Sequence, residues 1–336
     1  MQSSKEAIIT KILDQGKSLD GDSSQEFQKL ELKITNSDEY LEILNQEQPF
    51  SRWNPYETGQ RVTIQNIEQQ NWIITDYVRR PALLKLSLIF VFLVVAIGKW
   101  WGIRSLLSLI SSFAIIFGMI IPLILKGYNP LFVALAGALI IVPITFYLSH
   151  GIKKKTHVAV AGTMISLLLS GLLAANFMLS AHLTGFSSEE AGFLSVMTDD
   201  SLDIRGLLLA GIIISLLGTL DDVAVSQASF VQQLKEVNPK SSFKDLFTRA
   251  MKVGQDHISS MVNTLVLVYA GASLPLLLLF FTSDANPQQI INLEIVAEEI
   301  VRTLTGSIGV VLAAPITTLI AAAAFSKKDK ELKPKK

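Results

Sequence analysis

The sequence predicts an α-helical polytopic membrane protein of about seven transmembrane helices, with a small N-terminal β-rich domain outside the membrane. Half of the residues are hydrophobic and only 17% are charged, whereas soluble domains carry roughly 25% charged residues. From residue 82 onward, apolar stretches recur at close to the ~20 residues that cross the hydrocarbon core of a bilayer. Before that point, short runs rich in β-branched residues are separated by turn-forming residues, which is typical of strands.

Composition also limits which partners and which kinds of site we expect. The 29 basic and 29 acidic residues balance, so net charge gives no reason to expect a nucleic-acid partner. The chain has no cysteine, which excludes disulfides, thiolate metal sites and cysteine nucleophiles. Its four histidines show no metal-ligand spacing. We therefore expect no bound metal and no cofactor.

Residues 1–79 form the predicted β-rich domain. The runs AIITKIL, KLELKIT, RVTIQNI and WIITDYV are the candidate strands. Their number suits a small barrel or sandwich, with an OB-like barrel among the alternatives, and the connections do not decide the topology. Because no catalytic constellation lies in this region, we expect a recognition or spacer domain.

Residues 80–326 form the predicted transmembrane bundle. We assign seven spans, at 82–98, 106–125, 130–149, 157–183, 204–226, 258–281 and 295–325. The connections after the third and fifth spans and the tail at 327–336 are basic, whereas those after the fourth and sixth are acidic. Basic loops face the cytoplasm, so the C-terminus is expected inside and the β-rich domain outside. Arg79 and Arg80 on the outer flank depart from this rule.

An outward N-terminal domain must be carried across the membrane. Met1 is followed by polar residues rather than by an apolar segment. We therefore expect a signal or anchor helix upstream of the sequence given.

Residues 241–253 predict a basic amphipathic helix in the cytoplasm. Phe243, Leu246, Phe247 and Ala250 share one side, while the lysines and Arg249 lie mostly elsewhere. Such a helix suits an anionic inner leaflet. Docking of a cytoplasmic protein partner is the alternative.

The fifth span carries the strongest candidate for function. Gly211, Ser215, Gly218, Asp222 and Ser226 follow one another at intervals of three and four, so they share a helix face. Small residues allow helices to approach closely, and a carboxylate at membrane depth costs at least ~2.5–3.5 kcal/mol. This predicts that Asp222 lies on a helix–helix seam. The adjacent Asp221 points roughly 100° away, and the alternative is that both carboxylates are simply hydrated at the helix end.

Polar residues also occur in the other late spans. Asn176 lies in the fourth span, and Asp256 and Asn263 lie on one side of the sixth. These are further candidates for transport or coupling, because intramembrane polar residues often line a pathway; Asn263 could equally tie two helices together. The seventh span adds small residues and a proline to the predicted seam: Gly306, Gly309 and Pro315. A pathway is therefore expected among the last four helices.

Three blocks of sequence resemble the YibE/F-like family of bacterial membrane proteins. They are GTLDDVAVSQAS, VGQDHISSMVNTLVLVYAGASLPLLLL and EEIVRTLTGSIGVVLAAPITTLIAA, and DYVRRP precedes the membrane segment as in that family. The resemblance places family motifs at Asp222 and Ser226, at Gly254, Asp256 and Asn263, and at Gly306, Ser307, Gly309, Ala314 and Pro315. It implies a permease of the bacterial inner membrane and names no substrate.

The sequence is compatible with three functions, in decreasing order of support. The first is a transporter of a small solute or ion in the lipid bilayer, coupled to protons or cations through Asp222, because protonation removes the cost of burying a carboxylate. The alternative is a membrane accessory or assembly protein that binds partners and transports nothing. An intramembrane enzyme ranks last, because no nucleophile–base or metal constellation is found.

Overall fold

The computed structural model describes residues 4–20, 23–46, 53–68, 71–199, 201–282 and 286–326. The basic tail predicted at 327–336 lies outside the described residues. The chain divides into two compact units, Met1–Leu93 and Val94–Lys336, which are described one after the other.

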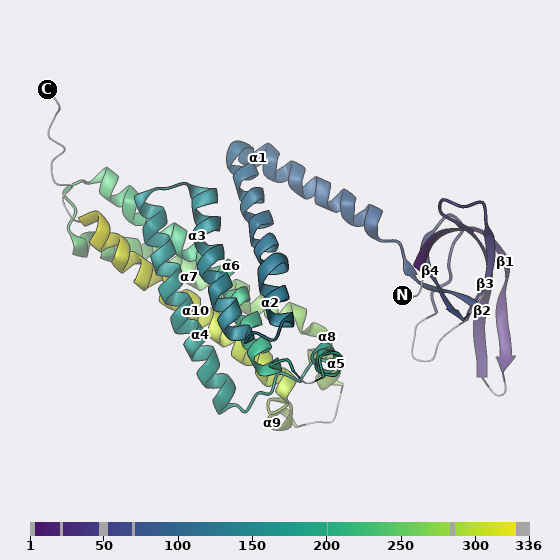
Figure 1. Ribbon diagram of the computed structural model, residues 1–336. Coiled ribbons are helices and arrows are strands. Elements are labelled where there is room, and N and C mark those ends of the chain that lie inside the picture. Colours follow the sequence, from purple (N-terminus) through teal and green to yellow (C-terminus); the bar gives the residue numbers. More distant parts are fainter. Residues whose placement is uncertain are drawn as a thin grey trace. The chain divides into compact units, whose positions relative to one another are not determined.

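The first unit contains a five-stranded antiparallel sheet, as the sequence predicts. Its strands are β1 (Ser4–Asp20), β2 (Ser23–Ile34), β3 (Tyr40–Gln46), β4 (Arg61–Glu68) and β5 (Asn71–Tyr77), in the order β3-β2-β1-β4-β5. The long β1 pairs with β2 over most of its length and with β4 through its first five residues, Ser4–Ile8. Strands β3 and β5, at the two edges, also contact each other, so the sheet curls back toward itself (Figure 1).

The alternation of buried apolar residues with more exposed residues along the strands explains the core of this unit. Ala7 and Ile9 on β1, Leu30 and Leu32 on β2, and Val62 and Ile64 on β4 are all fully buried. Successive side chains of a strand point to opposite faces, so each pair lines the inner face. The intervening residues are polar or half-buried.

The chain leaves β5 through a segment whose two arginines are paired. Arg79 contacts the Asp76 carboxylate at 2.6 Å, and Arg80 contacts Glu6 on β1 at 2.9 Å. The hydrogen bonds from Arg79 and from the Tyr77 N–H lower the pKa of Asp76. Both arginines of this segment therefore have carboxylate partners within the first unit.

The rest of the described chain is helical. The helices are α1 (Arg80–Ile115), the π-helical turn η1 (Ile116–Ile120), α2 (Ile121–Leu125), α3 (Pro130–His150), α4 (Lys154–Ser180), α5 (Glu189–Met197), α6 (Ile204–Val237), α7 (Phe243–Ala272), α8 (Leu274–Phe281), α9 (Pro287–Ile290) and α10 (Glu294–Ser326).

Several of these helices are long and apolar enough to cross a membrane. There are five such segments, Arg80–Leu125, α3, α4, α6 and α10, and a sixth if α7 and α8, which meet at 65°, are one broken span. The first segment holds 46 residues, about twice what one crossing needs. It is interrupted at Lys99, whose φ of 48° and ψ of −128° are not helical. Both of the first two predicted spans therefore lie in one helical stretch with a break between them.

Gly102 follows this break and lies close to the turn before it. A Cβ atom at this position would overlap the carbonyl oxygen of Val94. The sharp bend at Lys99 thus depends on the absence of a side chain at residue 102.

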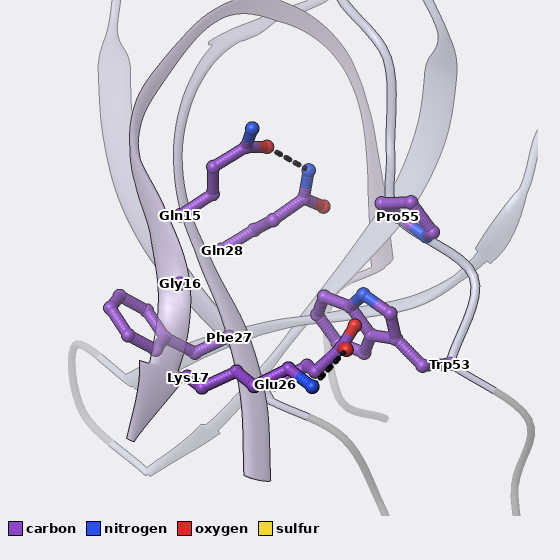
Figure 2. Close-up of a pocket in the computed structure, with 8 residues that line it drawn as sticks. All are labelled: Gln15, Gly16, Lys17, Glu26, Phe27, Gln28, Trp53 and Pro55. Atoms are coloured by element: carbon purple, nitrogen blue, oxygen red, sulfur yellow. Dashed lines mark hydrogen bonds and ion pairs between the residues drawn. The ribbon is translucent and has the colours of Figure 1, made fainter.

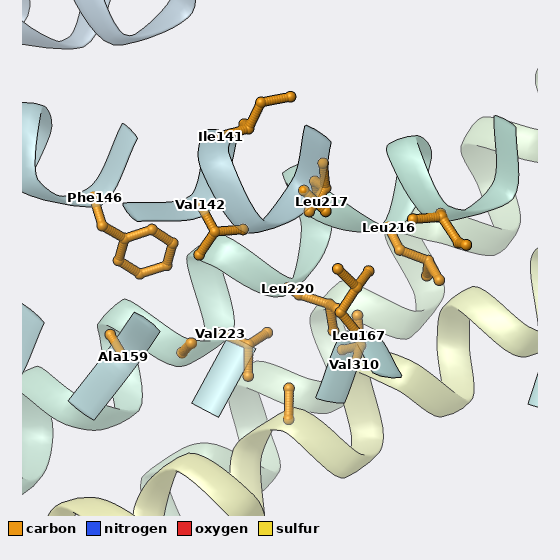
Figure 3. Packing of buried hydrophobic residues seen from close by; sticks show 14 of the residues in the cluster. Ile141, Val142, Phe146, Ala159, Leu167, Leu216, Leu217, Leu220, Val223 and Val310 are labelled. Atoms are coloured by element: carbon orange, nitrogen blue, oxygen red, sulfur yellow. The ribbon is translucent and has the colours of Figure 1, made fainter. Parts of the chain in front are cut away.

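Helices α4, α6 and α10 form the centre of the bundle. They pack on one another, α3 covers α6, and α7 packs on α10 and α6. Figure 3 shows the apolar contacts of this centre, in which Leu167, Leu216, Leu220 and Val310 are buried. On the outside, large apolar residues such as Leu172 and Leu319 are exposed, as lipid-facing positions are.

The segment 241–253 is helical, as predicted, but its apolar face packs on the bundle. It is the first part of the continuous helix α7, which begins at Phe243 and is capped by reciprocal hydrogen bonds between Ser242 and Asp245. Leu246 and Ala250 are fully buried in the bundle core. The apolar face therefore packs on the protein itself, because the helix continues directly into the bundle. Phe243, Lys244, Arg249 and Lys252 remain exposed.

Candidate functional site

Asp221 and Asp222 lie in a cleft of about 540 Å³ between three helices. Helix α6 supplies the two carboxylates, the second half of α1 supplies serines, and the end of α3 closes the third side. The lining residues are Trp101, Ser105, Ser108, Leu109, Ser112, Thr145, Ser149, His150, Asp221, Asp222, Val225 and Ser226. Most of them are polar, which is unusual for the interior of an apolar bundle.

The apolar face of α6 determines where its carboxylates point. Ile213, Leu216, Leu220 and Val223 are buried against the bundle core. Residues on the remaining part of the helix circumference must face away from that core. Asp222 and Ser226 therefore face the cleft rather than helices α4 and α10.

The two carboxylates are unequally buried. Asp222 is exposed, whereas Asp221 is partly buried and its Oδ1 atom is fully buried without a hydrogen-bond partner among the described residues. Asp222, which the sequence places on a helix–helix seam, is therefore the more exposed carboxylate of the pair. Asp221 lies one step around the helix, nearer to the apolar core.

The hydroxyl groups of the cleft are anchored to the backbone. Ser108 donates to the carbonyl of Thr145 at 3.4 Å, and Thr145 donates to the carbonyl of Val142 at 3.1 Å. Ser112 donates to the carbonyl of Ser108 at 3.2 Å. Each hydroxyl oxygen keeps lone pairs as acceptors, so the walls can solvate a proton donor or a cation.

Basic side chains surround the end of α3 beside the cleft. Arg104 donates to the carbonyls of Leu148, at 2.6 Å, and Tyr147, at 3.2 Å. Both Arg104 and Lys153 lie over the Trp101 ring, at 5.3 Å and 5.7 Å from its centroid. The carboxylates of the cleft thus lie near a basic rim that joins α1 to α3.

Small residues on α6 do not form the predicted seam. A Cβ atom at Gly211 or Gly218 would meet no other described atom within 4 Å, and the Ser215 hydroxyl bonds its own helix at the carbonyl of Ile212. The prediction of close helix approach is therefore wrong for this face. Close approach occurs on α10 instead, where a Cβ atom at Gly309 would lie 2.6 Å from the Ser170 hydroxyl of α4. Gly306 is also buried there, whereas Pro315 is half-buried.

The remaining predicted site residues do not gather at the cleft. Asn176 on α4, and Asp256 and Asn263 on α7, are all exposed, and none of them lines the cleft. Residues of α1 and α3 line the cleft, whereas the sequence predicted a pathway among the last four helices. Among the described residues, no group of three His, Asp or Glu side chains could hold a metal ion.

Comparison with known protein families agrees with the resemblance. The family described as YibE/F-like protein matches residues 86–327, which is more than half of the chain. The chain belongs to the YibE/F-like family. The match covers the helical bundle, including the whole cleft, and leaves out the β-rich domain. No curated protein and no solved structure matches the chain.

This YibE/F-like bundle also contains a buried polar residue that is not among those predicted from the sequence. Gln227 on α6 is fully buried, and its Oε1 atom accepts a hydrogen bond from Thr318 of α10 at 2.8 Å. The signal in the sequence was an amide at a position where α6 is otherwise apolar. Asp221 and Asp222 give a stronger signal in the sequence, because burying a carboxylate costs more free energy than burying an amide.

The β-rich domain of this YibE/F-like protein has a small cavity of its own, of about 330 Å³. Trp53 and Pro55 line it together with residues of β1 and β2, and Figure 2 shows Gln28 beside Gln15 and the Lys17–Glu26 ion pair, whose charged atoms are 3.5 Å apart. Gln28 is almost fully buried and exchanges hydrogen bonds with the backbone of Tyr56. These bonds tie the segment before β4 to β2, so the polar groups of this cavity already have structural partners.

Proposed function

We propose that this protein is a bacterial inner-membrane permease that moves a small cation, or a solute coupled to a proton, through the cleft between α1, α3 and α6. Asp221 and Asp222 bind the cation or proton. The observation that supports the proposal is a polar-lined cleft of about 540 Å³ that ends on two carboxylates in a helix apolar enough to span the membrane.

The chemistry of the cleft favours a cationic occupant. A carboxylate in a low-dielectric site is stabilised either by a bound cation or by protonation. Asp221 has a buried oxygen without a partner, while Asp222 is exposed to the cleft. We assign ion capture to Asp222 and the tighter, desolvated contact to Asp221.

The proposal includes a topology. Seven crossings follow if the stretch Arg80–Leu125 crosses twice, on the two sides of Lys99, and α7–α8 crosses once. The basic connection at Lys153 and Lys154 then faces the cytoplasm, and the β-rich domain lies outside. The cleft, which ends beside His150 and Trp101, opens toward the cytoplasm in this arrangement.

Flux through purified protein in proteoliposomes tests the proposal. Imposed gradients of protons, Na⁺, K⁺ and ammonium ions are followed with an internal pH dye and with ion-selective electrodes. We expect flux above that of empty vesicles for at least one cation, and a fall to background in both Asp221→Asn and Asp222→Asn.

Asp256→Asn is the matched control, because this carboxylate is exposed on α7 and does not line the cleft. It should transport like the parent protein. Unchanged flux in Asp221→Asn and Asp222→Asn would contradict the assignment of the cleft. Absence of flux for every cation tried would favour the accessory-protein alternative.

A further inference from the structure

Helix α7 has a polar face directed away from the bundle. On its inner side, Leu265 is buried in the bundle core, and through this side α7 packs on α10 and α6. The opposite side exposes four residues with hydrogen-bonding side chains and one leucine at helical spacing. They are Ser259, Ser260, Asn263, Thr264 and Leu267. We call these five residues the Asn263 face.

Contacts between helices fix the direction in which α7 runs. Helices α6 and α10 are parallel, because Leu216 lies against Gly309 and Gln227 bonds Thr318 farther along both helices. Helix α7 follows α6 after a short connection, and its Gly254 lies against Gln227. Helix α7 therefore runs antiparallel to α10, with Gly254 near the level of Thr318.

The Asn263 face lies at the middle depth of the bundle. Asn263 comes nine residues after Gly254, and Gly309 comes nine residues before Thr318. Because each helix rises ~1.5 Å per residue, Asn263 is level with Gly309, close to the middle of α10. Helix α10 is long and apolar enough to cross a membrane, so the Asn263 face lies at the depth of the hydrocarbon.

Lipid is a poor partner for such a face. The neighbouring helices expose apolar side chains, Leu168 and Leu172 on α4 and Ile308 and Val311 on α10. Asn263 is exposed as well, but hydrocarbon offers its amide no hydrogen-bonding group. Polar residues at membrane depth normally face protein or a water-filled cavity. The Asn263 face therefore requires a protein partner inside the membrane.

The chemistry of the Asn263 face fits a second copy of itself. A carboxamide has two N–H donors and a carbonyl acceptor, so two Asn263 side chains on either side of a two-fold axis can donate to each other. Ser259 and Ser260 are small enough for two helices to approach closely. None of the five residues is charged, so the face requires no oppositely charged partner. We propose that the Asn263 face is the interface of a two-fold symmetric homodimer within the membrane.

This interface is separate from the cleft between α1, α3 and α6. None of its five residues lines the cleft, so the proposal holds or fails without reference to transport. Asp256 lies on the same side of α7, about two turns closer to the start of the helix. Helices that cross at Asn263 separate toward their ends, so the two Asp256 carboxylates of a dimer are not brought into contact.

Oxidative cross-linking of single cysteines tests the interface. The native chain has no cysteine, so Ser260→Cys in the full-length protein gives one thiol. Beside a two-fold axis each residue lies near its own copy, within reach of a disulfide. In isolated membranes treated with an oxidant, we expect a product of twice the mass of the chain. The matched control is Leu168→Cys, which is exposed on α4 and should stay monomeric.

Two results of the cross-linking would overturn the proposal. One is equal cross-linking of Ser260→Cys and Leu168→Cys, because random collision in the membrane would explain both products. The other is a Ser260→Cys product with the mass of a complex with a different protein, which would assign the Asn263 face to that protein.

Energy transfer between labelled chains in liposomes, followed on dilution with lipid, measures the strength of the dimer. Because Asn263 is exposed, Asn263→Leu leaves the packing within one chain unchanged. It should raise the dissociation constant by roughly 5- to 30-fold through loss of the amide pair. Asn176→Leu, which removes an exposed amide of α4, should not. A parent protein that is monomeric at every dilution, or an Asn263→Leu variant that dissociates like the parent, would contradict the proposal.

Discussion

Gly162 and Gly218 both lie within long, apolar helices, but only Gly162 touches another helix. A Cβ atom at Gly162 would overlap the Thr317 hydroxyl, whereas at Gly218 it would meet no described atom within 4 Å. We expect Gly162→Ala to destabilise the bundle by roughly 1–3 kcal/mol through overpacking. Gly218→Ala should be neutral or stabilising by up to about 1 kcal/mol, since alanine is the better helix former.

Thermal unfolding of the two full-length variants in detergent measures this contrast. The parent protein and Gly211→Ala, another open position on the same face of α6, serve as references. A Gly218→Ala variant that unfolds as early as Gly162→Ala would mean that another chain or lipid occupies the open face.

At the scale of single residues, the sequence identifies the face of α6 that lines the cleft but not the helices that cover this face. The spacing of Asp222 and Ser226 correctly groups them on one face, because helical periodicity is local. Which neighbour covers that face depends on how α1 and α3 pack, which is not encoded in α6. Gln227 was missed for the same reason, since its importance comes from Gly254 and Thr318 on other helices.

Among the elements, the first turns of α7 pack differently from what the sequence predicts. Leu246 is fully buried in the bundle, whereas Phe243, three residues earlier, is 41% exposed. We expect Leu246→Ala to cost about 2–5 kcal/mol of bundle stability. Phe243→Ala should leave stability nearly unchanged, because much of this side chain is already in contact with the surroundings rather than with the bundle.

Thermal unfolding separates the two outcomes at this element. If Leu246→Ala melts with the parent protein, the first part of α7 is not packed as described, and the amphipathic surface helix would regain support. The sequence could not decide this point, because a helix that docks on its own bundle and one that docks on lipid show the same periodicity.

A second element, the bend at Lys99, tests how the first apolar stretch is built. In Gly102→Ala, the added Cβ atom would overlap the Val94 carbonyl. We expect the bend to open, with faster hydrogen exchange at the amides of residues 96–104 measured by mass spectrometry. Gly98→Ala is the control, because a Cβ atom there meets nothing within 4 Å. Similar exchange in both variants would mean that the bend does not depend on this contact.

At the scale of the whole molecule, composition and hydropathy suffice to predict a β-rich domain followed along the chain by apolar helices. These properties are averages over many residues, so errors at single positions cancel. The number of membrane spans is harder to predict from the sequence. Arg80–Leu125 is one helical stretch with an internal break, and α7–α8 is bent by 65°. A hydropathy plot treats a bend and a loop alike.

The orientation of the molecule gives the last prediction. The basic connections around Lys153 and Lys240 are expected in the cytoplasm, and the β-rich domain outside. Because the chain has no cysteine, Thr58→Cys in the β-rich domain and Lys240→Cys between α6 and α7 each provide one exposed thiol. A membrane-impermeant maleimide added to intact cells should label Thr58→Cys, and should label Lys240→Cys only after the inner membrane is opened. Labelling of Lys240→Cys in intact cells, with Thr58→Cys protected, would reverse the orientation and would place the mouth of the Asp221–Asp222 cleft on the outer side of the membrane.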